Sequence, residues 1–280
     1  MSLLPENKRR TVDRIDKKVM WIYGAPYSGK TFLANSFPNP VMLNTDGNVK
    51  FVDAPYVAIK DTMEGRVKKT AWENFKAVID ELEMNQNTFE TIVIDLLEDV
   101  LAHDRREILR NGKFTHETDM GGYGKGYQII ADDFLPVIEK VRNLNYPNII
   151  FLSHAKWEEV TSPSGETYSK VSPNIRPSLA LKISGMVDFT GHLTCEGDVR
   201  TISIKQTKAQ FGGGRPEFYG KTFPATYEAI CDLYNMKPME EVVSEPVAEI
   251  PAVETVEVQT EQVEEEVPKR RKLKRKDDGE

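Results

Sequence analysis

The chain has 280 residues, two cysteines and a formal net charge of −7. This length allows one large or two small domains, and Cys195 and Cys231 stand outside any C-x-x-C pair, which excludes the usual zinc and redox motifs. Residues 240–280 contain thirteen acidic and seven basic residues and so carry −6 of the charge. The remainder is nearly neutral, and its bulk charge neither favours nor excludes binding of nucleic acid.

The beginning of the chain is polar, and no apolar stretch approaches the length that spans a bilayer. We therefore expect a cytoplasmic protein with reduced thiols and no membrane partner. Residues 1–17 are charged and lack periodicity, and we interpret them as an N-terminal arm.

The first predicted strand, residues 18–23, runs directly into a complete G-x-x-x-x-G-K-[ST] phosphate loop. The loop reads Gly24-Ala25-Pro26-Tyr27-Ser28-Gly29-Lys30-Thr31, and a predicted helix over 30–36 follows it. Its glycines let the backbone N–H groups point at a phosphate, and the helix adds its positive end. We expect residues 24–32, which end at Phe32, to bind ATP, with Lys30 on the β- and γ-phosphates and Thr31 on Mg²⁺. The alternative is a chance glycine-rich turn.

Further along the chain, strand and helix patterns alternate, which predicts an α/β fold with a mostly parallel sheet flanked by helices. The strands are expected at 41–45, 91–95 and 148–153, and the helices at about 70–85, 96–111 and 126–144. Residues 112–126 are predicted to form a mobile loop. Two antiparallel pairs, a glycine-rich loop and a last helix complete a domain of residues 18–237; they are expected at 155–162 with 166–173, 187–194 with 199–205, 209–220 and 225–235.

Polar side chains end three of the predicted strands. Asp95 stands where a Walker-B aspartate would support Mg²⁺, or it caps a turn or helix. Asp46 either orients the attacking water or serves the turn before Gly47. His154 either senses the γ-phosphate or belongs to a strand-end hydrogen-bond network.

Cationic and aromatic residues suggest two further contacts. Lys205, Lys208 and Arg215 either reach the phosphates of a neighbouring subunit or are solvated surface charges. Tyr123 and Tyr127, with Lys113 and Lys125 nearby, either bind single-stranded DNA by stacking and phosphate contact or belong to an exposed loop without a ligand.

The tail, residues 238–280, is acidic and then basic, and it holds too little apolar surface to offset the entropy of ordering. We expect it to be disordered. Its basic stretch, 269–276, either attracts a nucleic-acid backbone, folds back on the acidic segment or serves as a nuclear address.

The phosphate loop, residues 43–47, Asp95 with its strand and the strand ending at His154 together resemble the RecA-like ATPases over about 18–236. More closely, the chain resembles the small phage-encoded ATPases of the Sak type, which assist single-strand annealing and recombination. The resemblance implies a Mg²⁺-dependent ATPase in the bacterial host cytoplasm that forms homo-oligomers and handles single-stranded DNA, with a single-strand binding protein as a further partner. It places Asp46 where that family usually has the water-activating Glu, which implies slow hydrolysis.

Two other functions remain open from the residues themselves. A small-molecule kinase uses the same loop, although residues 112–126 lack the arginines of a typical lid. A non-hydrolysing, nucleotide-gated scaffold, such as a helicase loader, would bind ATP without turnover.

Overall fold

The computed structural model describes residues 7–8, 15–162 and 165–235, all within the first of two compact units, Met1–Pro238. The predicted tail and most of the predicted arm lie outside these residues. The first half contains β1 (Lys18–Gly24), α1 (Lys30–Asn35), β2 (Pro40–Asn44), β3 (Tyr56–Ala58), β4 (Thr62–Glu64), β5 (Val67–Lys69), α2 (Ala71–Glu83), β6 (Thr91–Asp95) and α3 (Leu97–Gly112).

The second half begins with a short 3₁₀ helix, η1, and ends with α6. Its elements are η1 (Glu117–Met120), α4 (Lys125–Asn143), β7 (Asn148–Thr161), β8 (Thr167–Pro173), α5 (Pro177–Met186), β9 (Phe189–Glu196), β10 (Val199–Ser203), β11 (Gly213–Gly214), η2 (Pro216–Phe218), β12 (Thr222–Pro224) and α6 (Tyr227–Tyr234).

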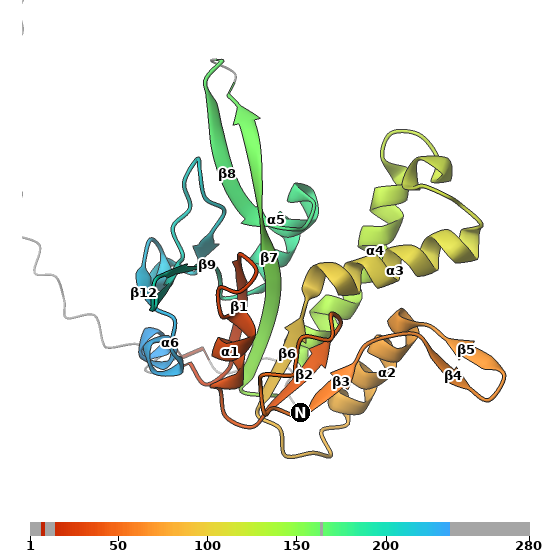
Figure 1. The fold of residues 1–280 in the computed structure, drawn as a ribbon, viewed down its shortest axis with the longest axis horizontal. Coiled ribbons are helices and arrows are strands. Elements are labelled where there is room, and N and C mark those ends of the chain that lie inside the picture. Colours follow the sequence, from red (N-terminus) through yellow and green to blue (C-terminus); the bar gives the residue numbers. More distant parts are fainter. Residues whose placement is uncertain (1–6, 9–14, 163–164, 236–280) are drawn as a thin grey trace, which may run out of the picture. The chain divides into compact units, whose positions relative to one another are not determined.

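The main sheet has the strand order β12-β10-β9-β1-β7-β6-β2-β3 (Figure 1). The pairs from β9 to β3 are parallel, whereas β10 and β12 are added antiparallel. One strand, β7, therefore lies between the phosphate-loop strand β1 and the Asp95 strand β6. This order confirms the predicted α/β fold, a mostly parallel central sheet flanked by helices, with antiparallel strands added towards its C-terminal end.

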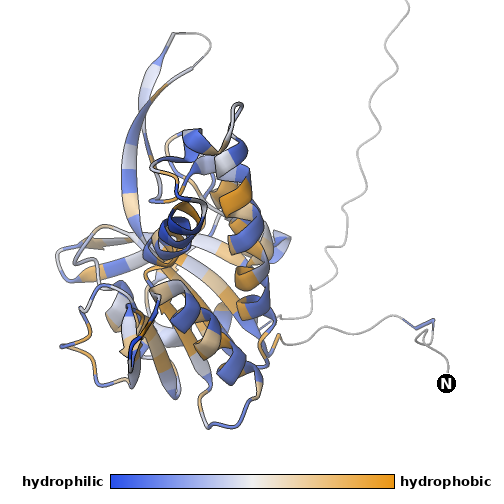
Figure 2. Ribbon diagram, turned by 90° about the vertical axis from the view of Figure 1, so that its right-hand side faces the viewer, coloured by the Kyte–Doolittle hydropathy of each residue, from blue (hydrophilic) through white to orange (hydrophobic). Residues whose placement is uncertain are grey.

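Both faces of the central strands β1, β2 and β6 are covered, so these strands are buried nearly throughout rather than alternating. In β1, Val19 and Trp21 pack into the core formed with α2, α3, α4 and α5, while Met20 and Ile22 pack on the opposite side with α1 and α6. Figure 2 shows this arrangement as hydrophobic strands enclosed by helices whose outer surfaces are polar. The parallel strands end at one edge, where the phosphate loop, Asp95 and Asn44 meet.

Most predicted boundaries agree with the structure to within two residues, but β7 does not. It continues through His154 to Thr161 and leaves the sheet as a two-stranded ribbon with β8 (Figure 1). His154 therefore lies within a strand, and the prediction that it ends one is wrong. The change from buried to alternating residues at this point reflects a change of partner, from β1 and β6 to β8, and not the end of the strand.

Several predicted loops contain regular structure. Residues 112–126 include η1 and the first residues of α4, and 209–220 include β11 and η2. The structure also adds α5 and the short strands β3, β4 and β5, for which the sequence makes no prediction. None of the helices among the described residues is long and apolar enough to cross a membrane.

Candidate functional site

The phosphate loop is shaped by glycines at its two ends. A Cβ on Gly24 would lie 2.5 Å from the carbonyl oxygen of Leu193 in β9, so only glycine fits there. Gly29 has φ 96° and caps α1, in the left-handed region that favours glycine. Between them, Ser28 N donates to the Ala25 carbonyl oxygen at 3.2 Å and closes a turn.

The loop presents both exposed and buried groups to a ligand. Ala25, Pro26 and Tyr27 are exposed, and so is Phe32 on α1. Ser28 is only 4% exposed, and its hydroxyl has no hydrogen-bond partner among the described residues. A buried hydroxyl without a partner costs free energy, and a phosphate oxygen in the loop would satisfy it.

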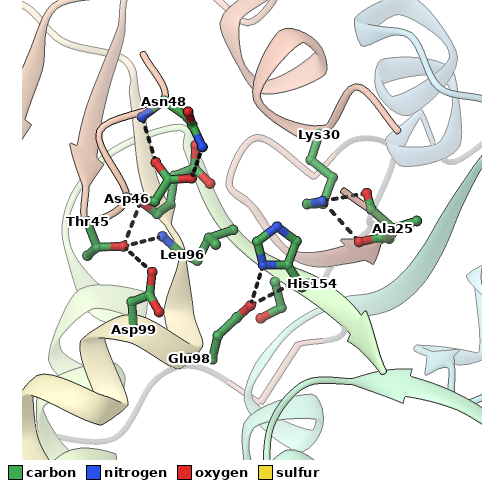
Figure 3. A network of polar contacts seen from close by, with 12 residues as sticks. Ala25, Lys30, Thr45, Asp46, Asn48, Leu96, Glu98, Asp99 and His154 are labelled. Atoms are coloured by element: carbon green, nitrogen blue, oxygen red, sulfur yellow. Dashed lines mark hydrogen bonds and ion pairs between the residues drawn. The ribbon is translucent and has the colours of Figure 1, made fainter. Parts of the chain in front are cut away.

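Lys30 lies inside the loop. Its Nζ donates to the carbonyl oxygens of Gly24 at 3.0 Å and Ala25 at 2.9 Å (Figure 3). Burial lowers the pKa of this amine, and the nearby carboxylates of Asp95, Glu98 and Asp46 oppose that shift. A phosphate would give the ammonium a charged partner in place of neutral carbonyls, which is a stronger contact.

Thr31 and Asp95 meet across β7. The Thr31 hydroxyl donates to Asp95 Oδ2 at 2.9 Å, and Asp95 is 2% exposed at the end of β6. Burial raises the pKa of Asp95 to about 6, against the lowering effect of the Thr31 hydrogen bond. A hydroxyl and a carboxylate within hydrogen-bond distance are oxygen ligands of the kind that Mg²⁺ prefers. The residues present therefore fit this metal.

Asp46 lies beyond β2, in a turn whose polar groups donate hydrogen bonds to its carboxylate. It accepts hydrogen bonds from Asn44 Nδ2 at 2.9 Å, from Asn48 N at 2.9 Å and from Asn48 Nδ2 at 3.0 Å (Figure 3). Burial favours a higher pKa, but these hydrogen bonds outweigh it and the pKa of Asp46 is lowered. Both oxygens therefore serve the turn, which makes Asp46 a weak base.

His154 forms a pair with Glu98 of α3. Glu98 Oε1 accepts a hydrogen bond from His154 N at 2.7 Å and lies 3.2 Å from Nδ1 of the same residue. Figure 3 shows the imidazole between Glu98 and Lys30. The Glu98 side chain is 9% exposed, and its Oε2 is buried with no hydrogen-bond partner among the described residues. The carboxylate thus holds the ring in one orientation at the edge of the site.

The sequence does not predict Glu98, or Arg200 of β10, whose side chain lies beside Gly29. Glu98 comes three residues after Asp95, in the first turn of α3, and that spacing is the only sequence signal for it. Arg200 gives no such signal, because the pairing of β10 with β9 brings it to the loop.

The predicted cations for a neighbouring subunit, Lys205, Lys208 and Arg215, are exposed and follow β10 in the chain. They do not join the cluster around Lys30 in this structure of a single chain. Their role between subunits stays a prediction.

The tyrosines predicted to bind nucleic acid border a cavity of about 400 Å³ between α3, α4 and α5. The guanidinium of Arg176 lies 3.8 Å from the centroid of the Tyr127 ring, and Tyr123 is fully exposed beside it. Lys182 also lines the cavity, while Arg105 is paired with Glu117. Lys113 and Lys125 are exposed on the same segment but do not line this cavity.

One comparison with known proteins, a match to a family model, covers the residues of this site. No curated protein sequence matches the chain. Among solved structures, the flagellar accessory protein FlaH from Methanocaldococcus jannaschii is similar over 66% of this chain and 76% of its own, with 9% sequence identity and a TM-score of 0.30. A family model described as an AAA domain, AAA_24, matches residues 16–216, which include the phosphate loop, Asp95 and His154. The chain therefore belongs to the AAA_24 family of AAA domains.

Proposed function

We propose that the protein binds ATP at the phosphate loop and hydrolyses it in a Mg²⁺-dependent reaction. The observation that carries this proposal is the contact between Thr31 and Asp95, next to a loop that already holds the Lys30 ammonium. Thr31 and Asp95 would hold the metal, which neutralises charge on the phosphates when bound. The loop amides and Lys30 would bind the β- and γ-phosphates.

The attacking water would meet two polar groups at the edge of the site. We assign its orientation to Asp46 and the sensing of the γ-phosphate to His154. Hydrolysis is expected to be slow, because the Asp46 oxygens are occupied by Asn44 and Asn48 and its pKa is lowered. The Glu98 carboxylate, 3.2 Å from His154 Nδ1, would orient the ring towards the γ-phosphate.

We further propose that hydrolysis is coupled to the handling of single-stranded DNA. The cavity beside Tyr127 supports this, since it combines aromatic rings with the cations Arg176 and Lys182. Rings that stack on bases and cations that meet phosphates are the usual means of binding single strands. The resemblance to Sak-type ATPases supports three further parts of the proposal. The protein would form a homo-oligomer with Lys205, Lys208 and Arg215 at its interfaces. It would act with a single-strand binding protein, in phage recombination or replication.

The test is ATP turnover with and without a short single-stranded DNA, in the wild type and in Lys30→Ala. We expect slow turnover that the DNA stimulates in the wild type, and no turnover in the variant. Turnover that DNA leaves unchanged would contradict the coupling to DNA and leave the small-molecule kinase to be tested with metabolite acceptors. Tight ATP binding without turnover would contradict hydrolysis and favour the nucleotide-gated scaffold.

A further inference from the structure

Arg200 lies on the same face of the sheet as the phosphate loop. In the strand register, Gly24 of β1 is opposite Leu193 of β9, and Leu193 is opposite Ile202 of β10. Ile202 packs in the core beneath α1, with Leu33. Because alternate residues of a strand point to the same face, Arg200 follows Ile202 towards α1 and the loop.

The side chain of Arg200 reaches the last glycine of the loop. A Cβ built on Gly29 would lie 2.6 Å from Nε of Arg200, 3.0 Å from Cδ and 3.6 Å from Cζ. Arg200 is exposed, and its side chain forms no hydrogen bond or ion pair with any residue that the structure describes. An arginine beside backbone amides, with no carboxylate to neutralise it, adds positive charge at a place that already favours an anion.

Arg200 and the metal-side residues approach the loop from opposite sides. Asp95 lies two strands away from β1 across β7, whereas Arg200 lies two strands away across β9. A metal held by Thr31 and Asp95 would draw the terminal phosphates to their side of the loop, which would leave the opposite side for the α-phosphate and the nucleoside. That direction leads towards Arg200.

We propose that Arg200 binds the α- and β-phosphates of the nucleotide held by its own chain. This inference rests on the proposed ATP site and deepens it. The guanidinium would donate to phosphate oxygens that are present in both ATP and ADP, so it would contribute equally to the binding of the two nucleotides. It would not contact the γ-phosphate and would not act in the chemical step.

The test is the equilibrium binding of ATP and of ADP, each with Mg²⁺, to the full chain and to Arg200→Ala. One or two charge-assisted hydrogen bonds correspond to about a 10- to 100-fold loss of affinity. We expect a loss of this size that is equal for ATP and ADP, because both nucleotides carry the α- and β-phosphates. Arg200→Lys, which keeps the charge, should recover part of the loss.

Two controls separate this contact from other effects. Val199→Ala alters the neighbouring exposed residue of β10, and Arg66→Ala removes a positive charge far from the loop in the β4–β5 turn; both should bind like the wild type. A loss for ATP alone, or no loss in Arg200→Ala while the wild type binds normally, would overturn the inference. Failure of the wild type to bind either nucleotide would instead overturn the proposed function, and the inference with it.

Discussion

Replacement of Thr31 by Val removes the only hydrogen-bond donor to the Asp95 carboxylate among the described residues, with little change in shape. Asp95 is 2% exposed and has a pKa of about 6, so at pH 8 it is an ionised carboxylate without a partner in this variant. A buried, unsatisfied charged acceptor costs about 1–3 kcal/mol. We expect Thr31→Val to lower the free energy of unfolding by that amount, in the absence of nucleotide.

A double-mutant cycle with Asp95→Asn isolates this contact. In the Asn background no charge is left unpaired, so Thr31→Val should cost about 1 kcal/mol less than it does in the wild type. The assay is urea unfolding of the four proteins at pH 8, repeated at pH 5. At pH 5, below the pKa of Asp95, the carboxyl is largely protonated, and the coupling between the two positions should shrink.

The same four proteins test the metal site. Each single substitution should remove the Mg²⁺ dependence of ATP binding, and the double variant should lose no more than either single variant. Thr31→Ser, which keeps the hydroxyl, is the matched control and should keep the Mg²⁺ dependence. Strictly additive effects, in both unfolding and Mg²⁺-dependent binding, would refute the reasoning that Thr31 and Asp95 act as a pair.

Three further outcomes follow from other contacts. Asp104 is buried on α3, and its pKa is raised to about 9 by burial and by Asp133. Because the folded state keeps the proton, this group should make wild-type stability fall as pH rises from about 4 to 9, and urea unfolding of Asp104→Asn should show a flatter pH profile. Glu98→Gln retains an oxygen that can accept from His154 but loses the negative charge. Steady-state kinetics should therefore show kcat lowered about tenfold with KM nearly unchanged. A raised KM with unchanged kcat would instead place Glu98 in substrate binding. Tyr127→Ala should abolish the stimulation of ATP turnover by single-stranded DNA without altering basal turnover, whereas Tyr127→Phe should retain the stimulation. Equal stimulation of the two variants would exclude stacking of a base on this ring.

Elements whose signals are local could be predicted from the sequence. The run from β1 through the phosphate loop into α1 follows from an apolar strand, two glycines and a helix start that adjoin one another. Strand β6 ends at Asp95 as expected, because a short run of apolar, β-branched residues before an aspartate is typical of a strand covered on both faces. The alternation of strand and helix patterns likewise predicts α2, α3 and α4 between the strands.

Features that depend on tertiary partners could not be predicted. The strands β3, β4 and β5 have three residues each and are largely exposed, so no hydrophobic period marks them. The predicted pairing of 155–162 with 166–173 is present, but the sequence does not show that this strand continues the buried strand before His154 without a break. Arg200 reaches the loop only through the pairing of β10 with β9, and no spacing in the sequence reports that contact.

The central claim is that Lys30 and the loop around it bind the phosphates of ATP. Titration calorimetry with Mg²⁺ and ATP, on the wild type and on Lys30→Ala, measures this directly. We expect saturable binding of one ATP per chain by the wild type and a loss of affinity of at least about 100-fold in the variant, since a buried ammonium–phosphate contact disappears. Equal affinity of the two proteins for ATP would contradict it.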